Sequence, residues 1–570
     1  MQRYRVLTTS DGRKAVEVRQ RGERLLNHAM YNKSSAFTRE ERVVFDLEGL
    51  LPEAVSTMEM QAQRVYANIC RKREPLERYI GMSALQDRNE HLFYRVLVDH
   101  LEDLLPIVYT PTVGQASIEY SHIFRRGRGI WITPAHRGRI ASVLRNSTYR
   151  DIRLIVATDN SAILGLGDQG AGGMVIPIGK LAIYSAAAGI HPTQTLPISL
   201  DVGTEREELL GDDFYLGWRG HRLRGEAYRS LIEEFVQAVR EVFPGCLIQW
   251  EDFSKANAFE ILEHYRRRVL SFNDDIQGTG ATALAGILAA GRISGEPFAD
   301  HRMVVLGTGA AGKGIAVQFR AALEESGVPA AEARHRIACL DSRGLLTTDR
   351  EGLDDYKREL AWEREWMERT GLSEGADLLS VVEAFEPSIL IGTSGQPGAF
   401  GEEVVRAMAA RPGRPIVFPF SNPTDRAEAQ PEDLLRWTDG RALIATGSPF
   451  PAVERDGRRI EIGQGNNALV FPGIGLGALV ASAREVTDGM FVSAAEALAG
   501  CVTDQELECG RVFPRISRLR EVTRRVAEAV VVQAREAAVG RKIDDDDIER
   551  EVADAVWEPR YPELIPADPT

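Results

Sequence analysis

The chain has 570 residues and a net charge of −14. That length suits several domains with substantial cores, and the acidic balance argues against a nucleic-acid binder, which normally needs a basic face. The five cysteines are scattered without CxxC spacing, a pattern typical of free thiols in a reducing compartment. With no signal-peptide core and no apolar run that looks long enough for a bilayer, we expect a cytoplasmic protein without a membrane partner.

The N-terminal region is charged and mostly helical in pattern. Residues 84–105 have a strongly amphipathic pattern that predicts one long helix. The next stretch, IVYTPTVG at 107–114, predicts a strand that enters a Pro/Gly turn with Tyr109 at the bend. Such a tyrosine usually packs in a core, and it becomes a candidate for chemistry only if it meets charged groups in space.

A glycine-rich stretch follows a predicted buried strand at 153–158. Gly165, Gly167 and Gly170 have GxGxxG spacing, but they lead into another loop instead of opening a helix, so we do not expect them to bind a dinucleotide. Lys180 begins a predicted helix of small apolar residues. A lysine in that setting needs a partner and has a lowered pKa, as a general base requires. The alternative is that it reaches the surface.

Two predicted strands follow, at 247–250 and 269–273, and each is followed directly by acidic residues. A helix that Ser254 begins joins them. In a βαβ unit the two strands are parallel and their carboxyl ends meet at one sheet edge, where ligands bind. Four acids follow the strands: Glu251, Asp252, Asp274 and Asp275. Clustered carboxylates repel unless a cation neutralises them, and an all-oxygen site suits Mg²⁺ or Mn²⁺. Any one acid taken alone could instead be an ordinary helix cap.

A dinucleotide fingerprint follows at residues 301–341. A strand leads into Gly307, Gly309 and Gly312, a helix follows, and a second strand ends in Asp341. The glycines let the backbone approach a pyrophosphate, and the terminal acid accepts ribose hydroxyls. An acid there favours NAD, whereas Arg343 could pair with a 2′-phosphate, so NADP stays open.

Three strand-to-turn units complete the predicted dinucleotide fold, at 388–398, 415–424 and 442–450. Their small or Asn/Ser ends, Asn422 among them, suit contact with a cofactor. Asn467 ends the loop QGNN before an apolar helix, where an amide could bind a carboxylate or simply cap the helix.

The predicted fold is α/β, with a Rossmann-type domain and a second α/β domain for substrate. Four regions are expected: a helical N-terminal region at 1–125, a substrate and metal domain at 126–277, the NAD domain at 278–465, and C-terminal helices at 466–570.

Ten motifs in order resemble the malic enzyme family over nearly the whole chain. They are YTPTVG, ILGLGD, IPIGKL, DVGT, EDF, FNDDIQGT, the second glycine turn, SNPT, GSPF and GQGNN. The resemblance implies oxidative decarboxylation of malate to pyruvate and CO₂ with NAD(P) and Mn²⁺ or Mg²⁺, in a homo-oligomer, a dimer or tetramer.

The resemblance also implies a role for each candidate residue. By that match the metal ligands are Glu251, Asp252 and Asp275. Lys180 is the base at the C2 hydroxyl, Asp274 orients it, and Tyr109 protonates the enolpyruvate carbon. Asn422 and Asn467 match the substrate-binding amides.

One departure affects substrate binding. Malic enzymes carry an arginine immediately before ILGLGD that clamps the substrate carboxylate, and this chain has Ala162 there. Loss of such charge-assisted bonds weakens binding, unless Arg125, Arg126 or another arginine substitutes. Malolactic enzymes, a branch that forms lactate with NAD kept bound, resemble this chain at that position. A regulator that binds NAD without turnover is the alternative from another class.

Overall fold

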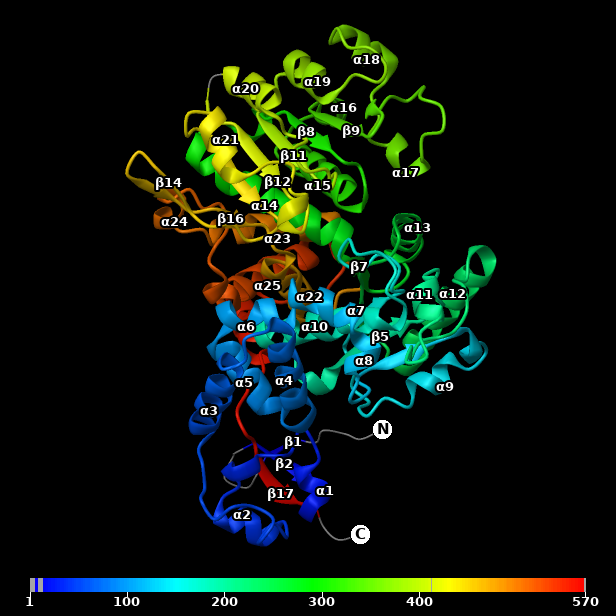
Figure 1. Ribbon diagram of the computed structural model, residues 1–570, viewed down its shortest axis with the longest axis vertical. Coiled ribbons are helices and arrows are strands. Elements are labelled where there is room, and N and C mark those ends of the chain that lie inside the picture. The colour runs from blue at the N-terminus through cyan, green and yellow to red at the C-terminus, as the bar shows by residue number, and fades with distance from the viewer. Residues whose placement is uncertain (1–5, 9–13, 412, 568–570) are drawn as a thin grey trace. The chain divides into compact units, whose positions relative to one another are not determined.

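The computed structural model describes residues 6–8, 14–411 and 413–567. It divides into two units (Figure 1). Unit 1 comprises Met1–Phe253 and Asp554–Thr570, and unit 2 comprises Ser254–Ala553.

Unit 1 contains a parallel sheet in which β3, β5, β4 and β6 lie in that order. The strands are β3 (Ile130–Ile132), β4 (Leu154–Thr158), β5 (Thr195–Leu200) and β6 (Leu247–Trp250). Every residue of β4 and β6 is buried, as expected for parallel strands covered on both faces. The helix α10 (Val175–Ile183) packs on β4 and β5 and continues as a π-helical turn over Tyr184–Ala188.

Among the described residues one segment, Gly170–Ala188, is long and apolar enough to cross a membrane. Its composition contradicts the expectation that no such run exists. The segment is 94% buried inside the protein, so its apolar residues have a packing role.

The N-terminal part of unit 1 is helical, as predicted, but its elements differ from the expected ones. The single helix expected over 84–105 is three helices, α4 (Pro75–Arg88), α5 (Glu90–Asp99) and α6 (Leu101–Val108). The strand expected at 107–114 is wrong, because α6 includes Val108 and α7 (Thr112–Ile118) follows at once. The apolar residues that suggested a strand continue the buried face begun by Leu101, Leu104 and Leu105, and that helical spacing decides the structure.

The remaining elements of unit 1 surround these two parts. Its other helices are α1 (Gly22–Leu26), α2 (Arg39–Val44), α3 (Met58–Cys70), α8 (Tyr120–Ile123), α9 (Ile140–Leu144), α11 (Glu207–Leu210) and α12 (Gly225–Val242). A small separate sheet joins the two ends of the chain: β2 (Lys14–Val18) pairs with β1 (Val6–Thr8) and with β17 (Glu563–Pro566).

Unit 2 has a seven-stranded sheet with the order β10-β9-β8-β11-β12-β13-β16. The β10–β9 pair is antiparallel and the other pairs are parallel. The strands are β8 (Met303–Leu306), β9 (Ile337–Asp341), β10 (Gly344–Leu345), β11 (Ile389–Gly392), β12 (Ile416–Pro419), β13 (Leu443–Thr446) and β16 (Gly463–Gln464). The chain leaves β8 toward β9 on one side and returns to β11 on the other. Ligands of doubly wound sheets bind at such a reversal, and the predicted Rossmann-type fold is confirmed.

Helices cover both faces of this sheet (Figure 1). They include α14 (Thr279–Ser294), α15 (Ala310–Glu325), α16 (Ala330–His335), α19 (Leu378–Phe385), α20 (Glu402–Ala410) and α21 (Pro431–Trp437). The further helices of the unit are α13 (Lys255–Tyr265), α17 (Asp355–Arg358), α18 (Arg364–Arg369), α22 (Phe471–Val480), α23 (Asp488–Gly500), α24 (Asp504–Glu508), α25 (Leu519–Glu536) and α26 (Asp545–Ala555), the last extending past the unit's end. Short strands β7 (Ser271–Asn273), β14 (Val453–Arg455) and β15 (Arg458–Ile460) complete it.

Candidate active site

Two of the predicted metal ligands, Glu251 and Asp252, directly follow β6 in unit 1. They are 2% and 6% exposed. Asp252 has φ of +56°, a left-handed conformation that aspartate tolerates better than most residues. Its carbonyl accepts from the Ala162 N–H at 3.1 Å and its Oδ1 from the Leu164 N–H at 3.3 Å. The loop that carries Ala162 therefore lies directly against the second carboxylate.

Lys180 is buried beside Glu251. Its Nζ lies 2.9 Å from Glu251 Oε1, and the two side chains are 1% and 3% exposed. The alternative in which this lysine reaches the surface is therefore wrong. Lys180 also lies near the end of α10 and not at the start of a helix, because the helix begins at Val175.

Glu251 is held from its other side as well. Gln249 donates to its Oε2 at 2.8 Å, and the Tyr184 hydroxyl donates to Gln249. A buried ion pair is stable only when its remaining hydrogen-bonding capacity is met, and this chain of contacts meets it. Lys180 is thus fixed in position beside a buried carboxylate.

Tyr109 joins this group at the end of α6. It is 7% exposed, and Lys180 Nζ lies 5.2 Å from the centre of its ring. Gly179 makes the approach of the two helices possible, because a Cβ there would lie 2.7 Å from the Val108 carbonyl oxygen. Unit 1 therefore brings together Tyr109, Lys180 and the adjacent pair Glu251 and Asp252, from three distant segments of the sequence.

In unit 2 the predicted residues Asp274 and Asn467 contact each other. Asp274 begins a π-helical turn at Asp274–Gly278 and is fully buried. The Asn467 amide donates to its carboxylate at 3.1 Å and to the Thr279 hydroxyl at 3.0 Å. The neighbouring Asn466 side chain accepts from the Ala468 N–H and caps the helix. The side chain of Asn467 instead donates to the buried carboxylate of Asp274. Asp275, next in the chain, is half-buried.

The glycine turn after β8 has the geometry expected of a dinucleotide site. Gly307 has φ of +99°, and a Cβ there would lie 2.5 Å from the Thr393 backbone. A Cβ at Gly312 would lie 1.9 Å from the Gly307 carbonyl oxygen. Gly309 occupies the N-cap of α15, a 16-residue helix. Of the earlier glycines, Gly165 and Gly167 lie before a short 3₁₀ segment that Gly170 begins and that leads into α10. That these glycines do not bind a dinucleotide stays a prediction.

Asp341 ends β9, as predicted, but two cations already contact it. Lys357 Nζ lies 2.8 Å from its Oδ2, and Arg350 donates to the same oxygen. Although burial acts in the opposite direction, these bonds lower its pKa to about 2. The Arg343 side chain donates to the carbonyls of Glu351 and Gly352 at 3.4 Å, so its guanidinium is directed to the backbone.

Asn422 follows β12 and is exposed, with its amide oxygen accepting from the Ser448 hydroxyl at 2.6 Å. Glu428, later in the chain, is 0% exposed. Glu428 Oε1 accepts from the Ser394 N–H at 2.7 Å, the Ser394 hydroxyl at 2.8 Å and the Ser421 hydroxyl at 2.6 Å. One buried carboxylate therefore joins the loops that follow β11 and β12. Glu428 could not be predicted as a buried residue, because an acid in the polar run TDRAEAQ carries no local sign of burial.

Known families and proteins match nearly all of this chain. The family described as "Malic enzyme, N-terminal domain" matches residues 86–266, and "Malic enzyme, NAD binding domain" matches residues 276–535. The NAD-dependent malic enzyme of Pseudomonas aeruginosa is 45% identical over 560 residues, covering 97% of this chain and 98% of that protein. The chain belongs to the malic enzyme family.

Other malic enzymes agree with this assignment. The NAD-dependent malic enzyme of Aeromonas hydrophila is 45% identical over 540 residues, covering 95% of this chain and 96% of that protein. The crystal structure of the Entamoeba histolytica malic enzyme is similar in fold, with a TM-score of 0.54 and 22% identity over 90% of this chain and 91% of that one. These comparisons give the malolactic alternative no support.

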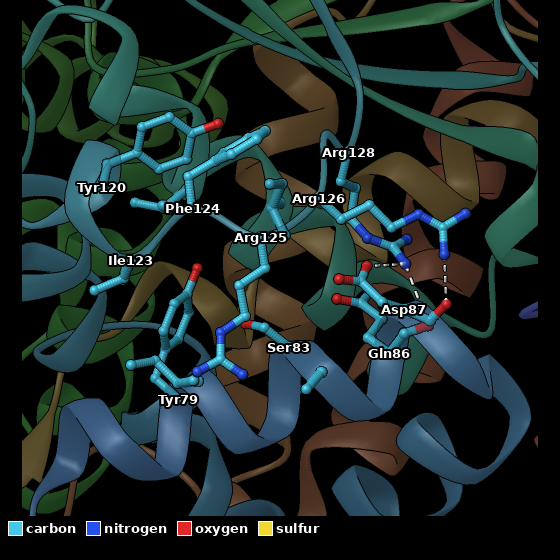
Figure 2. A pocket seen from close by; sticks show the side chains of 14 residues that line it. Tyr79, Ser83, Gln86, Asp87, Tyr120, Ile123, Phe124, Arg125, Arg126 and Arg128 are labelled. Carbon is cyan, nitrogen blue, oxygen red and sulfur yellow. Dashed lines mark hydrogen bonds and ion pairs between the residues drawn. The ribbon is translucent and has the colours of Figure 1, made fainter. Parts of the chain in front are cut away.

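The structure gives Arg125 and Arg126 a setting of their own in this malic enzyme. Both line a pocket beside α4 (Figure 2), and none of Tyr109, Lys180 and Glu251 lines that pocket. That one of them substitutes for the clamp that Ala162 lacks stays a prediction from the sequence.

Proposed function

We propose that this protein is an NAD-dependent malic enzyme that oxidatively decarboxylates malate to pyruvate and CO₂. The observation that carries the proposal is the buried Lys180–Glu251 pair with Asp252 and Tyr109 around it. It occurs in a chain that is 45% identical over nearly its whole length to a protein named for this activity.

As the family resemblance implies, we propose Glu251, Asp252 and Asp275 as the ligands of a divalent cation. Three carboxylates offer hard oxygen ligands, which suit Mn²⁺ or Mg²⁺. A cation held there would supply Lewis-acid polarisation of the C2 oxygen and stabilise developing negative charge, and bound NAD would supply the hydride acceptor.

Side chains of the protein carry out the proton transfers. Lys180, in its neutral form, accepts the proton of the C2 hydroxyl, and Glu251 holds the resulting ammonium in place by the contact at 2.9 Å. After CO₂ leaves, the Tyr109 hydroxyl protonates C3 of enolpyruvate. Asn467 and Asn422 bind the substrate's oxygens, and we propose that Asp274, which holds the Asn467 amide, tunes Lys180.

NAD is the proposed cofactor in preference to NADP. A carboxylate at the end of β9 repels a 2′-phosphate, and Asp341 stays ionised because Lys357 and Arg350 contact it. Arg343, the candidate partner for that phosphate, is occupied by backbone carbonyls. The malic enzymes of Pseudomonas aeruginosa and Aeromonas hydrophila are both named NAD-dependent.

The assay supplies malate, Mn²⁺ and NAD to the purified protein. We expect stoichiometric NADH and pyruvate. Lactate without net NADH would refute the proposal in favour of malolactic chemistry, and NAD binding without turnover would make the protein a regulator. We also propose a homo-oligomer in the cytoplasm, where the five free cysteines stay reduced.

A further inference from the structure

Four buried side chains of unit 1 form a chain of contacts at the candidate active site. Lys180 lies on α10, and Tyr184 begins the π-helical turn that continues this helix. Gln249 belongs to β6, and Glu251 directly follows that strand. All four residues are at most 2% exposed. Polar groups buried to this extent need partners within the protein, so each contact among them affects the next.

The spacing of the four residues explains how the contacts can form together. The Tyr184 N–H donates to the Lys180 carbonyl, four residues earlier, so the two side chains lie on one face of the helix, about 5–6 Å apart. Gln249 and Glu251 are alternate residues of an extended segment and lie on one side of the sheet, about 6.6 Å apart. The strand pairing includes Glu251, whose N–H donates to the Ala157 carbonyl at 2.9 Å. A pair on the helix can therefore face a pair on the strand, one to one.

The middle contact of the chain determines the orientation of the Gln249 amide. A glutamine amide has one oxygen that accepts and one nitrogen that donates. The Tyr184 hydroxyl donates to the oxygen, Oε1, and the nitrogen, Nε2, donates to Glu251 Oε2 at 2.8 Å. In the opposite orientation the amide oxygen would face the carboxylate, and two acceptors would meet without a hydrogen between them. Tyr184 thus favours the one orientation in which Gln249 can bond Glu251.

Glu251 is in turn held at both of its oxygens. Lys180 Nζ lies 2.9 Å from Oε1, and Gln249 donates to Oε2. A carboxylate with a partner on each oxygen has one preferred orientation, and so do its remaining lone pairs. A group that already has its bound orientation loses less conformational freedom when a ligand binds. The affinity of Glu251 for a cation therefore depends on the amide that holds it.

We propose that Tyr184 is a positioning residue for Glu251 and that it acts through the Gln249 amide. The hydroxyl keeps the amide nitrogen directed at the carboxylate, and the carboxylate keeps one orientation for Lys180 and for the cation. The inference rests on the proposed function, because that function makes Glu251 a metal ligand. It adds to that function two residues that neither bind the metal nor transfer a proton.

The alternative is that the bond between Tyr184 and Gln249 only satisfies two buried polar groups. A second pair of the same kind occurs elsewhere in unit 1, where the Tyr561 hydroxyl donates to Gln61 Oε1 at 2.6 Å. Gln61 is also fully buried, and its amide nitrogen donates to the Lys33 carbonyl at 3.0 Å. Removal of the Tyr561 hydroxyl is therefore a matched control for the loss of this type of bond.

The test measures Mn²⁺ binding to the full-length protein without NAD or malate, from the electron paramagnetic resonance signal of free Mn²⁺. Tyr184→Phe removes the hydroxyl, and Gln249→Met removes the amide but keeps the length of the side chain. A double variant carries both changes, and Tyr561→Phe is the control. Circular dichroism checks that each variant is folded.

We expect the wild type and Tyr561→Phe to bind Mn²⁺ with equal affinity, and Tyr184→Phe to bind it about tenfold more weakly, as is typical when a residue that holds a metal ligand is changed. Because Tyr184 acts through the amide, the double variant should have the affinity of Gln249→Met alone. Losses that add in the double variant would overturn the route through Gln249.

Two further outcomes separate the inference from the proposed function. Wild-type affinity in Tyr184→Phe would overturn the inference alone. If Tyr184→Phe does not fold, wild-type affinity in Gln249→Met overturns it instead. Failure of the folded wild type to bind Mn²⁺ would overturn the metal assignment of the proposed function, and the inference with it.

The affinity for NAD distinguishes positioning of Glu251 from a general loosening of the fold. Tyr184 belongs to unit 1, whereas the glycine turn at Gly307 belongs to unit 2. The Kd for NAD, measured by calorimetry on the same preparations, should therefore be unchanged in Tyr184→Phe. An equal loss of affinity for NAD and for Mn²⁺ would overturn the inference.

Discussion

Replacement of Glu428 is the sharpest test of how unit 2 holds its candidate ligand-binding loops. The carboxylate accepts three hydrogen bonds of 2.6–2.8 Å from Ser394 and Ser421. The Ser421 hydroxyl in turn accepts from the Gly395 N–H at 2.8 Å, and the Thr393 hydroxyl donates to the Gly307 carbonyl at 2.6 Å. The same loop therefore packs beneath the glycine turn, while Ser421 directly precedes Asn422.

The expected loss of stability follows from these hydrogen bonds to Glu428. A hydrogen bond to a charged group contributes about 1.5–3 kcal/mol and a neutral one about 0.5–1.5 kcal/mol. Glu428→Gln keeps the shape and weakens three bonds, and relief of the buried charge offsets part of the loss. We expect it to lower the free energy of unfolding by about 1–3 kcal/mol. Glu428→Ala leaves buried donors without acceptors. We expect it to lower the free energy of unfolding by about 3–5 kcal/mol.

Denaturant unfolding and steady-state kinetics measure the two consequences. Because the loops contact the glycine turn and carry Asn422, we expect the KM for NAD to rise about tenfold in Glu428→Gln, equivalent to about 1.4 kcal/mol. Glu432→Gln, at an exposed position four residues along, is the control. Wild-type stability and KM in Glu428→Gln would refute the reasoning. Lost stability with an unchanged KM would restrict Glu428 to a structural role.

Three further predictions concern the catalytic residues and pH. Asp275→Asn should abolish Mn²⁺-dependent turnover and leave the Kd for NAD largely unchanged; equal loss of both would contradict its assignment as a metal ligand. Lys180→Gln should lower kcat by about 10²–10⁴-fold without unfolding the protein, and a loss below tenfold would exclude it as the base. Burial lowers the pKa of His91 from 6.5 to about 3, so below pH 6.5 the unfolded chain takes up a proton that the folded chain does not. Stability should therefore fall as the pH drops from 6.5 toward 3, by at most about 1.4 kcal/mol per pH unit for this residue. Thermal unfolding from pH 7 to 4 should show a flatter dependence in His91→Gln than in the control His264→Gln, and identical profiles would contradict this account.

Several features of this protein could be predicted from the sequence because they depend on short, local patterns. The strands β4, β6 and β8 are apolar runs bounded by turns, and the turn at Gly307, Gly309 and Gly312 has a spacing that few other structures require. The order of the motifs identified the family over nearly the whole chain, which the 45% identity confirms. The candidate residues Tyr109, Lys180 and Glu251 were each named from the chain, but no local pattern specified which of them touch.

Other features depend on contacts between distant segments, and only the tertiary structure decided them. Residues 107 and 108 continue α6 because their side chains complete a buried helical face, although their composition equally fits a strand. Lys180 is buried because Glu251, 71 positions later in the numbering, supplies its counter-ion. Glu428 is buried because the serines that hold it come from the loops after two neighbouring strands of the sheet. A buried charge is stable only with its partners in place, and those partners are set by the packing of the whole fold.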